Sequence, residues 1–207
     1  HSGGEKEEGC GLKIRKVLLK LSEKFVPAPV AVYEKAQGLW ISRAIVTACE
    51  LNLADLLASG PKDIHSLSAE SKTDPDFLYR LMRALAGEGI FRELPGKVFM
   101  NTPLSGSLKE GENSLKYLIL QQFGHNSVKL LLPLTEVIQT GENHARKIFG
   151  KNVFEYLENN PEKNDIYNKG MDNSSGMMAM ALLSSYSFKG IQTMVDIGGG
   201  HGLLLAH

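Results

Sequence analysis

The sequence predicts a mainly helical protein with one β-hairpin in its first half and one strand–loop–helix unit at its C-terminal end. Apolar residues recur at helical spacing through most of residues 12–189. The turn Pro95-Gly96 separates two short apolar runs, as in a hairpin. Near the end, an apolar run at 193–197 is followed by three consecutive glycines and then by helix-forming residues. These three observations set the fold class.

Composition is that of an ordinary globular protein. The 207 residues are 43% hydrophobic and 22% charged, and the 23 basic and 23 acidic residues give a net charge of zero. This balance predicts no partner nucleic acid and no attraction to an anionic membrane. Two cysteines, Cys10 and Cys49, are too few for a disulfide framework or a metal site. We therefore expect no bound metal. No apolar run reaches the roughly 18 residues of a membrane span, so we expect a cytoplasmic protein.

The N-terminal residues contain two different helical patterns. Residues 1–11 are glycine-rich and charged, and we expect a flexible head or the remnant of a tag. The segment 12–25 predicts a basic amphipathic helix, which suits a membrane surface or, given the neutral chain, a partner helix. The segment 30–49 is apolar on more than one face. It is therefore expected to be buried on both sides, against a second subunit or in the core of a monomer.

Residues 50–100 predict three short helices and the hairpin. Asp74 and Pro75 supply an N-cap and a first helical residue for the third helix, which Gly87 and Gly89 end. The expected helices cover residues 50–58, 63–70 and 75–87, and the hairpin covers 90–100. This order is that of a winged helix, assigned to residues 12–113. Winged helices often bind DNA, but the third helix opens with Asp74 and Asp76, so we interpret the domain as a scaffold.

A polar stretch at 101–113 forms a domain boundary, and helical patterns continue beyond it. We expect residues 114–189 to be helical, with helices at 115–120, 128–139, 149–158 and 166–183. Pro133 must kink the second of these or mark its first turn. The last of these carries four methionines, at 171, 177, 178 and 180. Methionines adapt to flat apolar ligands, but they also fill ordinary cores, so both interpretations stay open.

The C-terminal glycine loop predicts a nucleotide-type cofactor cradle. Its pattern is Asp196-x-Gly198-x-Gly200-x-Gly202, whereas the dinucleotide fingerprint would require a glycine in place of Leu203. Glycine permits a tight strand-to-helix turn and lets the backbone approach a ligand closely. The alternative is a structural turn between a buried strand and a helix.

Two motifs resemble those of a known family. Val153-Phe154-Glu155-Tyr156, Pro161 and the run from Tyr167 to Ser175 resemble the F-E-Y…P…F-N-K-G-M-x-x-x-S pattern of plant caffeate- and flavonoid-type O-methyltransferases. Hydroxyindole O-methyltransferases and bacterial enzymes of secondary metabolism belong to the same family. The glycine motif also follows the K-G-M motif at about the family's interval. The resemblance covers nearly the whole chain from about Val30. It implies a winged-helix dimerisation domain, a helical linker and substrate cap at residues 114–189, and a Rossmann-like domain that binds S-adenosylmethionine (SAM).

This resemblance implies a function for the intact protein: a homodimer that transfers a methyl group from SAM to a hydroxyl of a small aromatic molecule. It implies substrate contacts at Met171 and Tyr167. The implied SAM-binding residues are Ser175, Asp196, Gly198, Gly199, Gly200 and Gly202.

The catalytic histidine of the family would lie beyond His207, so the resemblance implies no catalytic residue within this chain. Residues 190–207 would be the start of a truncated SAM domain, and the chain an N-terminal fragment that is inactive alone. Two alternatives are kept: a non-catalytic dimerisation or regulatory module, and a winged-helix DNA-binding protein.

Overall fold

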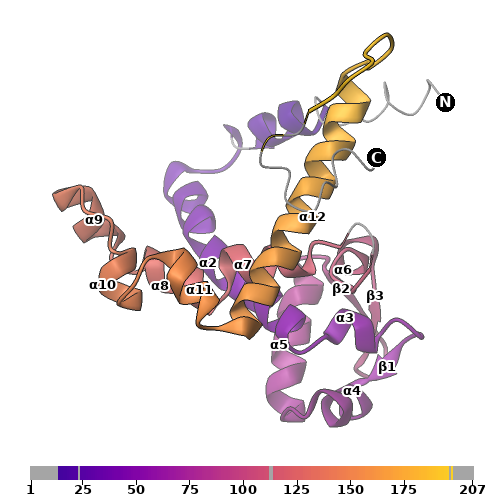
Figure 1. Cartoon of the computed structure of the whole chain (residues 1–207). Helices are drawn as coiled ribbons and strands as arrows, with labels where there is room; N and C mark the ends of the chain where they lie inside the picture. Colours follow the sequence, from indigo (N-terminus) through magenta and orange to yellow (C-terminus); the bar gives the residue numbers. More distant parts are fainter. Residues whose placement is uncertain (1–13, 23, 112–113, 196, 198–207) are drawn as a thin grey trace.

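The computed structural model describes residues 14–22, 24–111, 114–195 and 197 (Figure 1). Residues 14–22 are helical. The helices that follow are α2 (Ala28–Glu50), α3 (Leu53–Leu56), α4 (Ile64–Ser71), α5 (Pro75–Gly87), α6 (Pro103–Gly106), α7 (Lys116–Phe123), α8 (His125–Leu131), α9 (Leu134–Thr140), α10 (Ala145–Phe149), α11 (Val153–Glu158) and α12 (Pro161–Ser185). The strands are β1 (Lys62–Asp63), β2 (Phe91–Leu94) and β3 (Val98–Asn101). The described chain is therefore mainly helical, as predicted.

A small antiparallel sheet closes the N-terminal half. Its strand order is β1-β3-β2, and Leu94 pairs with Val98 next to the Pro95-Gly96 turn. The three helices α3, α4 and α5 and the hairpin lie where the sequence predicts them. Strand β1 is a finding of the structure, because two residues are too short to show the alternation that marks a strand.

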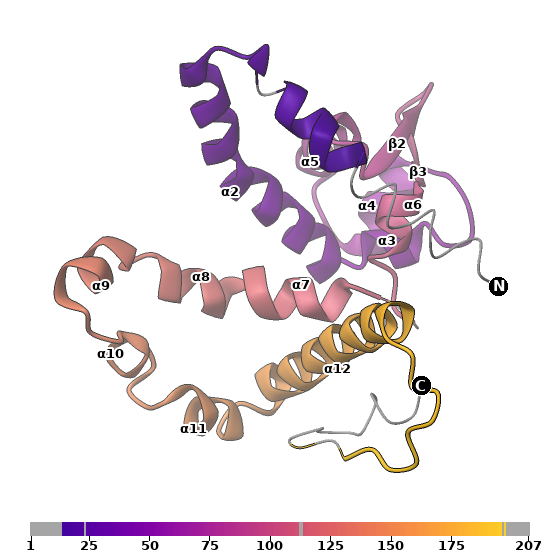
Figure 2. The same cartoon turned by 90° about the horizontal axis from the view of Figure 1, so that it is seen from above.

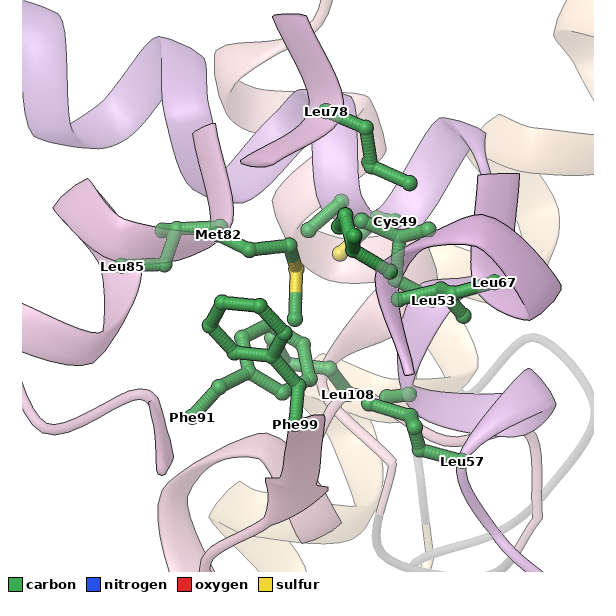
Figure 3. Packing of buried hydrophobic residues seen from close by; sticks show 13 residues of the cluster. Cys49, Leu53, Leu57, Leu67, Leu78, Met82, Leu85, Phe91, Phe99 and Leu108 are labelled. Carbon is green, nitrogen blue, oxygen red and sulfur yellow. The ribbon is translucent and has the colours of Figure 1, made fainter. Parts of the chain in front are cut away.

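One hydrophobic core joins these elements (Figure 3). In the close-up, Met82 of α5 points toward Phe91 and Phe99 of the hairpin, and the C-terminal end of α2 contributes Cys49. Aspartates cap two of the surrounding helices. The carboxylate of Asp63 accepts hydrogen bonds from backbone N–H groups in the first turn of α4, and that of Asp74 does so in the first turn of α5. The predicted capping of α5 is thus confirmed.

The C-terminal helices differ from the prediction in their bounds. The helix expected at 128–139 begins earlier, at His125, and is interrupted at Pro133, where a kink or a first turn was expected. Two helices, α8 and α9, result, because proline lacks the N–H that a continuous helix needs. The helix expected at 149–158 begins only at Val153, because Phe149 ends a separate helix, α10, whose C-cap is Gly150 with φ 70°. Helix α12 begins at Pro161 rather than at 166, since proline is well suited to a first helical position.

The strand expected at 193–197 is not formed by the described residues there. Residues 191–195 have no regular structure. A strand needs a neighbouring strand to satisfy its backbone groups, and no neighbour pairs with these residues in the described sheet. The predicted head at 1–11 and the loop from Gly198 onward lie outside the described residues, as does Asp196.

Helix α2 is buried only near its C-terminal end, at Val46, Ala48 and Cys49. Its N-terminal half exposes large apolar side chains, among them Tyr33, Leu39 and Trp40, the last 78% exposed. The alternative of a central core helix in a monomer is therefore wrong for this half of α2.

Helix α5 bears on the DNA-binding alternative. Its two arginines are engaged within the domain: Arg80 lies over the ring of Phe77, and Arg83 forms an ion pair with Glu93 at 3.7 Å. Its N-terminal end carries the acidic residues Asp74 and Asp76, which disfavour binding to a phosphate backbone.

In the part of the chain that the structure describes, no helix combines the length and the apolar character needed to span a membrane.

A partly buried ion pair ties the N-terminal half to the helices beyond it. The Nζ of Lys116, on α7, lies 2.7 Å from the carboxylate of Asp55, on α3, and the lysine side chain is only 5% exposed. Asp55 also accepts a hydrogen bond from the backbone N–H of Glu110. One carboxylate thus holds both the start of α7 and the chain that leads to it.

We expect Asp55→Asn to destabilise the protein by about 3 kcal/mol, because it leaves the buried ammonium of Lys116 without its closest counter-charge. The double variant Asp55→Asn/Lys116→Met should recover part of this loss, since it removes the unpaired charge as well. Urea denaturation of the three proteins measures both effects. A double variant as unstable as Asp55→Asn alone would show that the unpaired charge of Lys116 is not the cause of the loss.

Candidate functional site

A cavity of about 410 Å³ lies among α7, α8, α11, α12 and the C-terminal end of α2. This volume is typical of pockets that hold small organic molecules. Four aromatic side chains line it: Tyr117, Phe149, Tyr156 and Tyr167. The cavity therefore offers several flat apolar surfaces to a ligand.

The aromatic residues are held by pairwise ring contacts. Phe149 and Tyr156 stack with their ring centres 4.5 Å apart. Tyr167 meets the ring of Phe154 edge-on at 6.5 Å. Asn152 forms a reciprocal cap with Glu155 at the start of α11, which fixes the helix that carries Phe154 and Tyr156. The F-E-Y segment thus supplies one residue to the cavity and one support for Tyr167.

Polar groups also line the cavity and would orient a ligand. They include Glu50, Gln121, His125, Asn126 and Lys163. Lys116 lines it too, but its ammonium is paired with Asp55. The chemical character of the cavity is therefore aromatic and apolar with several hydrogen-bonding groups, a combination that fixes the orientation of a small molecule.

Cys49 lines the cavity and also belongs to the hydrophobic core. Burial raises its pKa to about 11, while the positive charge of Lys116 acts in the opposite direction. The thiol is therefore protonated at neutral pH and contributes a small apolar surface.

Three of the residues singled out from the sequence lie on one face of α12. Tyr167, Met171 and Ser175 are spaced by four residues, which places them one above the other along about 12 Å of helix. Tyr167 lines the cavity; Met171 is exposed beside it, and its sulfur lies 4.0 Å from the Nε2 of Gln121. Ser175 is half-buried one turn further on. The face runs from the cavity toward the C-terminal end of α12.

Gly170 allows α12 to cross α7 closely. A Cβ atom at this position would lie 2.9 Å from the Cβ of Gln121 and 3.0 Å from the carbonyl oxygen of Tyr117. The Oδ1 of Asn173 accepts a hydrogen bond from the backbone N–H of Leu118, in the first turn of α7. The K-G-M segment therefore fixes how α12 sits on α7, and with it the position of Tyr167.

The other residues assigned to the site from the sequence cannot be placed beside the cavity. Asp196, Gly198, Gly199, Gly200 and Gly202 are outside the described residues. None of the methionines of α12 lines the cavity, so the described part of the chain does not support a methionine-walled pocket there.

Sequence reasoning missed Phe149 and Gln121, which no motif marks. Among the described residues, no cluster of histidine, cysteine and carboxylate side chains could hold a metal ion.

Two family models match this chain. Residues 33–110 match the O-methyltransferase dimerisation domain, and residues 132–207 match the O-methyltransferase domain. The first match covers most of α2 and the small sheet. The second covers α9 to α12 and the glycine loop.

Individual relatives agree with these matches. Phenazine O-methyltransferase PhzM of Lysobacter antibioticus is 30% identical over 87% of this chain and 53% of its own length. The crystal structure of N,N-8-amino-8-demethyl-D-riboflavin dimethyltransferase from Streptomyces davawensis superimposes with a TM-score of 0.79 at 27% identity, over 87% of this chain and 55% of that one. CalO1, a methyltransferase in calicheamicin biosynthesis, was solved with SAH (S-adenosylhomocysteine) bound. It superimposes with a TM-score of 0.75 at 27% identity, over 86% of this chain and 54% of that one. The chain thus spans about half the length of these relatives.

We expect Gly170→Ala to lower the stability by about 1–3 kcal/mol, because the added methyl group must push α12 away from α7. The matched control is Gly176→Ala on the same helix, where a Cβ would meet no atom within 4 Å. There alanine should stabilise by about 0.5–1 kcal/mol, as in any helix interior. Thermal unfolding of both variants gives the comparison, and equal gains at the two positions would disprove the close crossing.

Proposed function

The chain belongs to the O-methyltransferase family, and we propose that the full-length protein transfers a methyl group from SAM to a hydroxyl group of a small aromatic molecule. The observation that carries the proposal is the aromatic cavity beside α12, whose wall includes the tyrosine of the family motif. Its volume of about 410 Å³ suits one small ring system with its substituents.

The proposed roles follow the face of α12. Tyr167, with Phe149 and Tyr156, would hold the aromatic ring, and Met171 would lie against the same ring next to the cofactor. Ser175 would contact SAM together with Asp196 and the loop glycines Gly198, Gly199, Gly200 and Gly202. Exposure of Met171 and the partial burial of Ser175 leave both side chains accessible to ligands. The order along α12 supports this division, with the cavity at one end and the chain that leads to the loop at the other.

SAM would supply an electrophilic methyl group on a sulfonium. In such an in-line displacement the protein lowers the barrier mainly by holding the acceptor oxygen in line with the methyl group. The cavity residues orient the acceptor ring, and the fixed crossing at Gly170 keeps Tyr167 in place relative to α7. We assign no general base within residues 1–207; a histidine after His207 would remove the hydroxyl proton.

The domain division belongs to the same proposal. Residues 12–113 would form a winged-helix dimerisation domain, residues 114–189 the substrate cap, and residues 190–207 the start of the SAM domain. The exposed apolar side chains of α2 support a homodimer, because a second copy would cover them. Matches to both domains of the family favour the enzyme over a non-catalytic dimerisation module.

In the full-length protein, we expect Gly200→Val to weaken SAM binding at least about tenfold, or 1.4 kcal/mol, because a branched side chain would occupy the space next to the backbone where the cofactor lies. Isothermal titration calorimetry with SAM measures the change. Gly87→Ala is the control, since its Cβ would meet no atom within 4 Å and α5 lies outside the site. Unchanged SAM affinity in the Gly200 variant would refute the cofactor assignment.

Tyr167→Leu should separate the two halves of the site. Loss of the ring contact is expected to raise KM for an aromatic acceptor about threefold to tenfold, in line with about 0.5–1.5 kcal/mol for an aromatic pair. The affinity for SAM should stay the same. Steady-state kinetics with paired phenol and aniline acceptors also shows whether oxygen or nitrogen is methylated, and a preference for the amine would overturn the assignment to a hydroxyl.

A further inference from the structure

The helix of residues 14–22, which we call the N-terminal helix, is amphipathic and exposed along its whole length. Figure 1 shows it as the indigo segment that precedes α2. Four large apolar side chains recur at the spacing of one helix face and are 45–59% exposed: Ile14, Val17, Leu18 and Leu21. We call these four residues the apolar face. The described chain therefore leaves this face in contact with solvent.

Basic side chains border the apolar face. Residues 12–25 contain five basic residues and one acidic residue: Lys13, Arg15, Lys16, Lys20 and Lys24 against Glu23. On a helix of about 3.6 residues per turn, Arg15 lies beside one edge of the face and Lys20 beside the other. Side chains of this length lay their carbon stems along an apolar surface while the charged ends reach outward. The helix thus presents an apolar strip between two positively charged margins.

The neutral charge of the whole chain does not cancel this local excess. Attraction to a charged surface fades over a Debye length of roughly 8–10 Å, so only the charges near that surface contribute to it. Three glutamates at positions 5, 7 and 8 precede the helix and oppose the attraction. The apolar face must therefore supply part of any binding energy, together with the basic margins.

We propose that the N-terminal helix is a binding site for the surface of an anionic lipid bilayer, with the apolar face among the lipid headgroups and the basic margins on their phosphates. Charge complementarity selects this occupant. A bilayer offers an apolar layer directly beneath an anionic one, which is the order that this helix presents. The match to the dimerisation domain begins only at residue 33, so the helix lies ahead of the part that the family shares.

The test is the partition of the full-length protein onto sedimented vesicles. Phosphatidylcholine vesicles with about 30% phosphatidylglycerol should bind it at least about tenfold more tightly than phosphatidylcholine alone, because the basic margins contact anionic headgroups. Raising the salt concentration from about 0.05 M to about 0.5 M should reduce this difference, since ions screen the attraction. Equal binding to the two kinds of vesicle would overturn the inference.

Two neighbouring leucines give a matched pair of variants. Leu18→Glu should weaken binding to the anionic vesicles at least about tenfold, because it places a carboxylate among apolar groups. Leu19→Glu makes the same change outside the apolar face and should weaken binding less than about threefold. Both side chains are about half exposed, so both variants should fold as the wild type does. Equal losses for the pair would show that the apolar face does not enter the bilayer.

A second pair tests the basic margin. Lys20→Glu should weaken vesicle binding about tenfold or more, whereas Lys151→Glu, at an exposed position far along the chain, should leave it unchanged. Equal effects would indicate non-specific adsorption and overturn the inference. If Leu18→Glu dissociates an oligomer in sedimentation velocity while vesicle binding persists, the apolar face packs against a second copy, and the inference is also wrong.

Hydrogen exchange gives a second readout. Backbone amides of residues 14–22 should exchange at least about tenfold more slowly with anionic vesicles present, because the bilayer would stabilise this short helix. Residues 125–140 should be unaffected. The inference does not depend on methyl transfer: a full-length enzyme that methylates its acceptor but ignores vesicles would refute the lipid site and leave the proposed function standing.

Discussion

The close crossing of α7 and α12 at Gly170 is the contact on which the candidate site depends. Helix α7 packs against α2 on one side and α12 on the other, so it joins the N-terminal half to the wall that carries Tyr167 (Figure 2). The absence of a side chain at Gly170 lets the two backbones approach, and Asn173 then satisfies an N–H at the start of α7. A few ångströms more between these helices would change the shape of the cavity, because both helices line it.

The cavity is assembled from elements that have little stability of their own. Helices α8, α10 and α11 have seven, five and six residues, and each depends on its neighbours rather than on internal hydrogen bonds. The Asp55–Lys116 ion pair and the α7–α12 crossing provide the fixed frame, and the aromatic contacts of Phe149 and Tyr167 attach the shorter pieces to it. Helices α7 and α12 belong to this frame and also face the cavity, whereas α8, α10 and α11 supply the rest of its helical lining. Such a division allows the lining to change without loss of the fold.

Local sequence signals predicted the N-terminal half well because its elements are specified locally. Asp74-Pro75 marks the start of α5 and Pro95-Gly96 the hairpin, so neither needs distant contacts to be recognised. Strand β1 was missed because only its pairing with β3 defines it. The described residues of 193–197 form no strand for a related reason, because a strand is stable only beside another strand. In the site, the motif identified Tyr167, but Phe149 and Gln121 come to the cavity through tertiary packing that no local pattern encodes.

Cys49 shows how packing also decides reactivity. Cys49 belongs both to the hydrophobic core and to the residues that line the cavity, and burial raises the pKa of its thiol to about 11. A thiolate attacks an electrophilic carbon far more readily than a phenol does, whereas a thiol does so poorly. In the proposed reaction, this sulfur atom would therefore compete poorly with an acceptor hydroxyl for the methyl group. The low polarity that suits an aromatic ring would also protect the protein from alkylating itself.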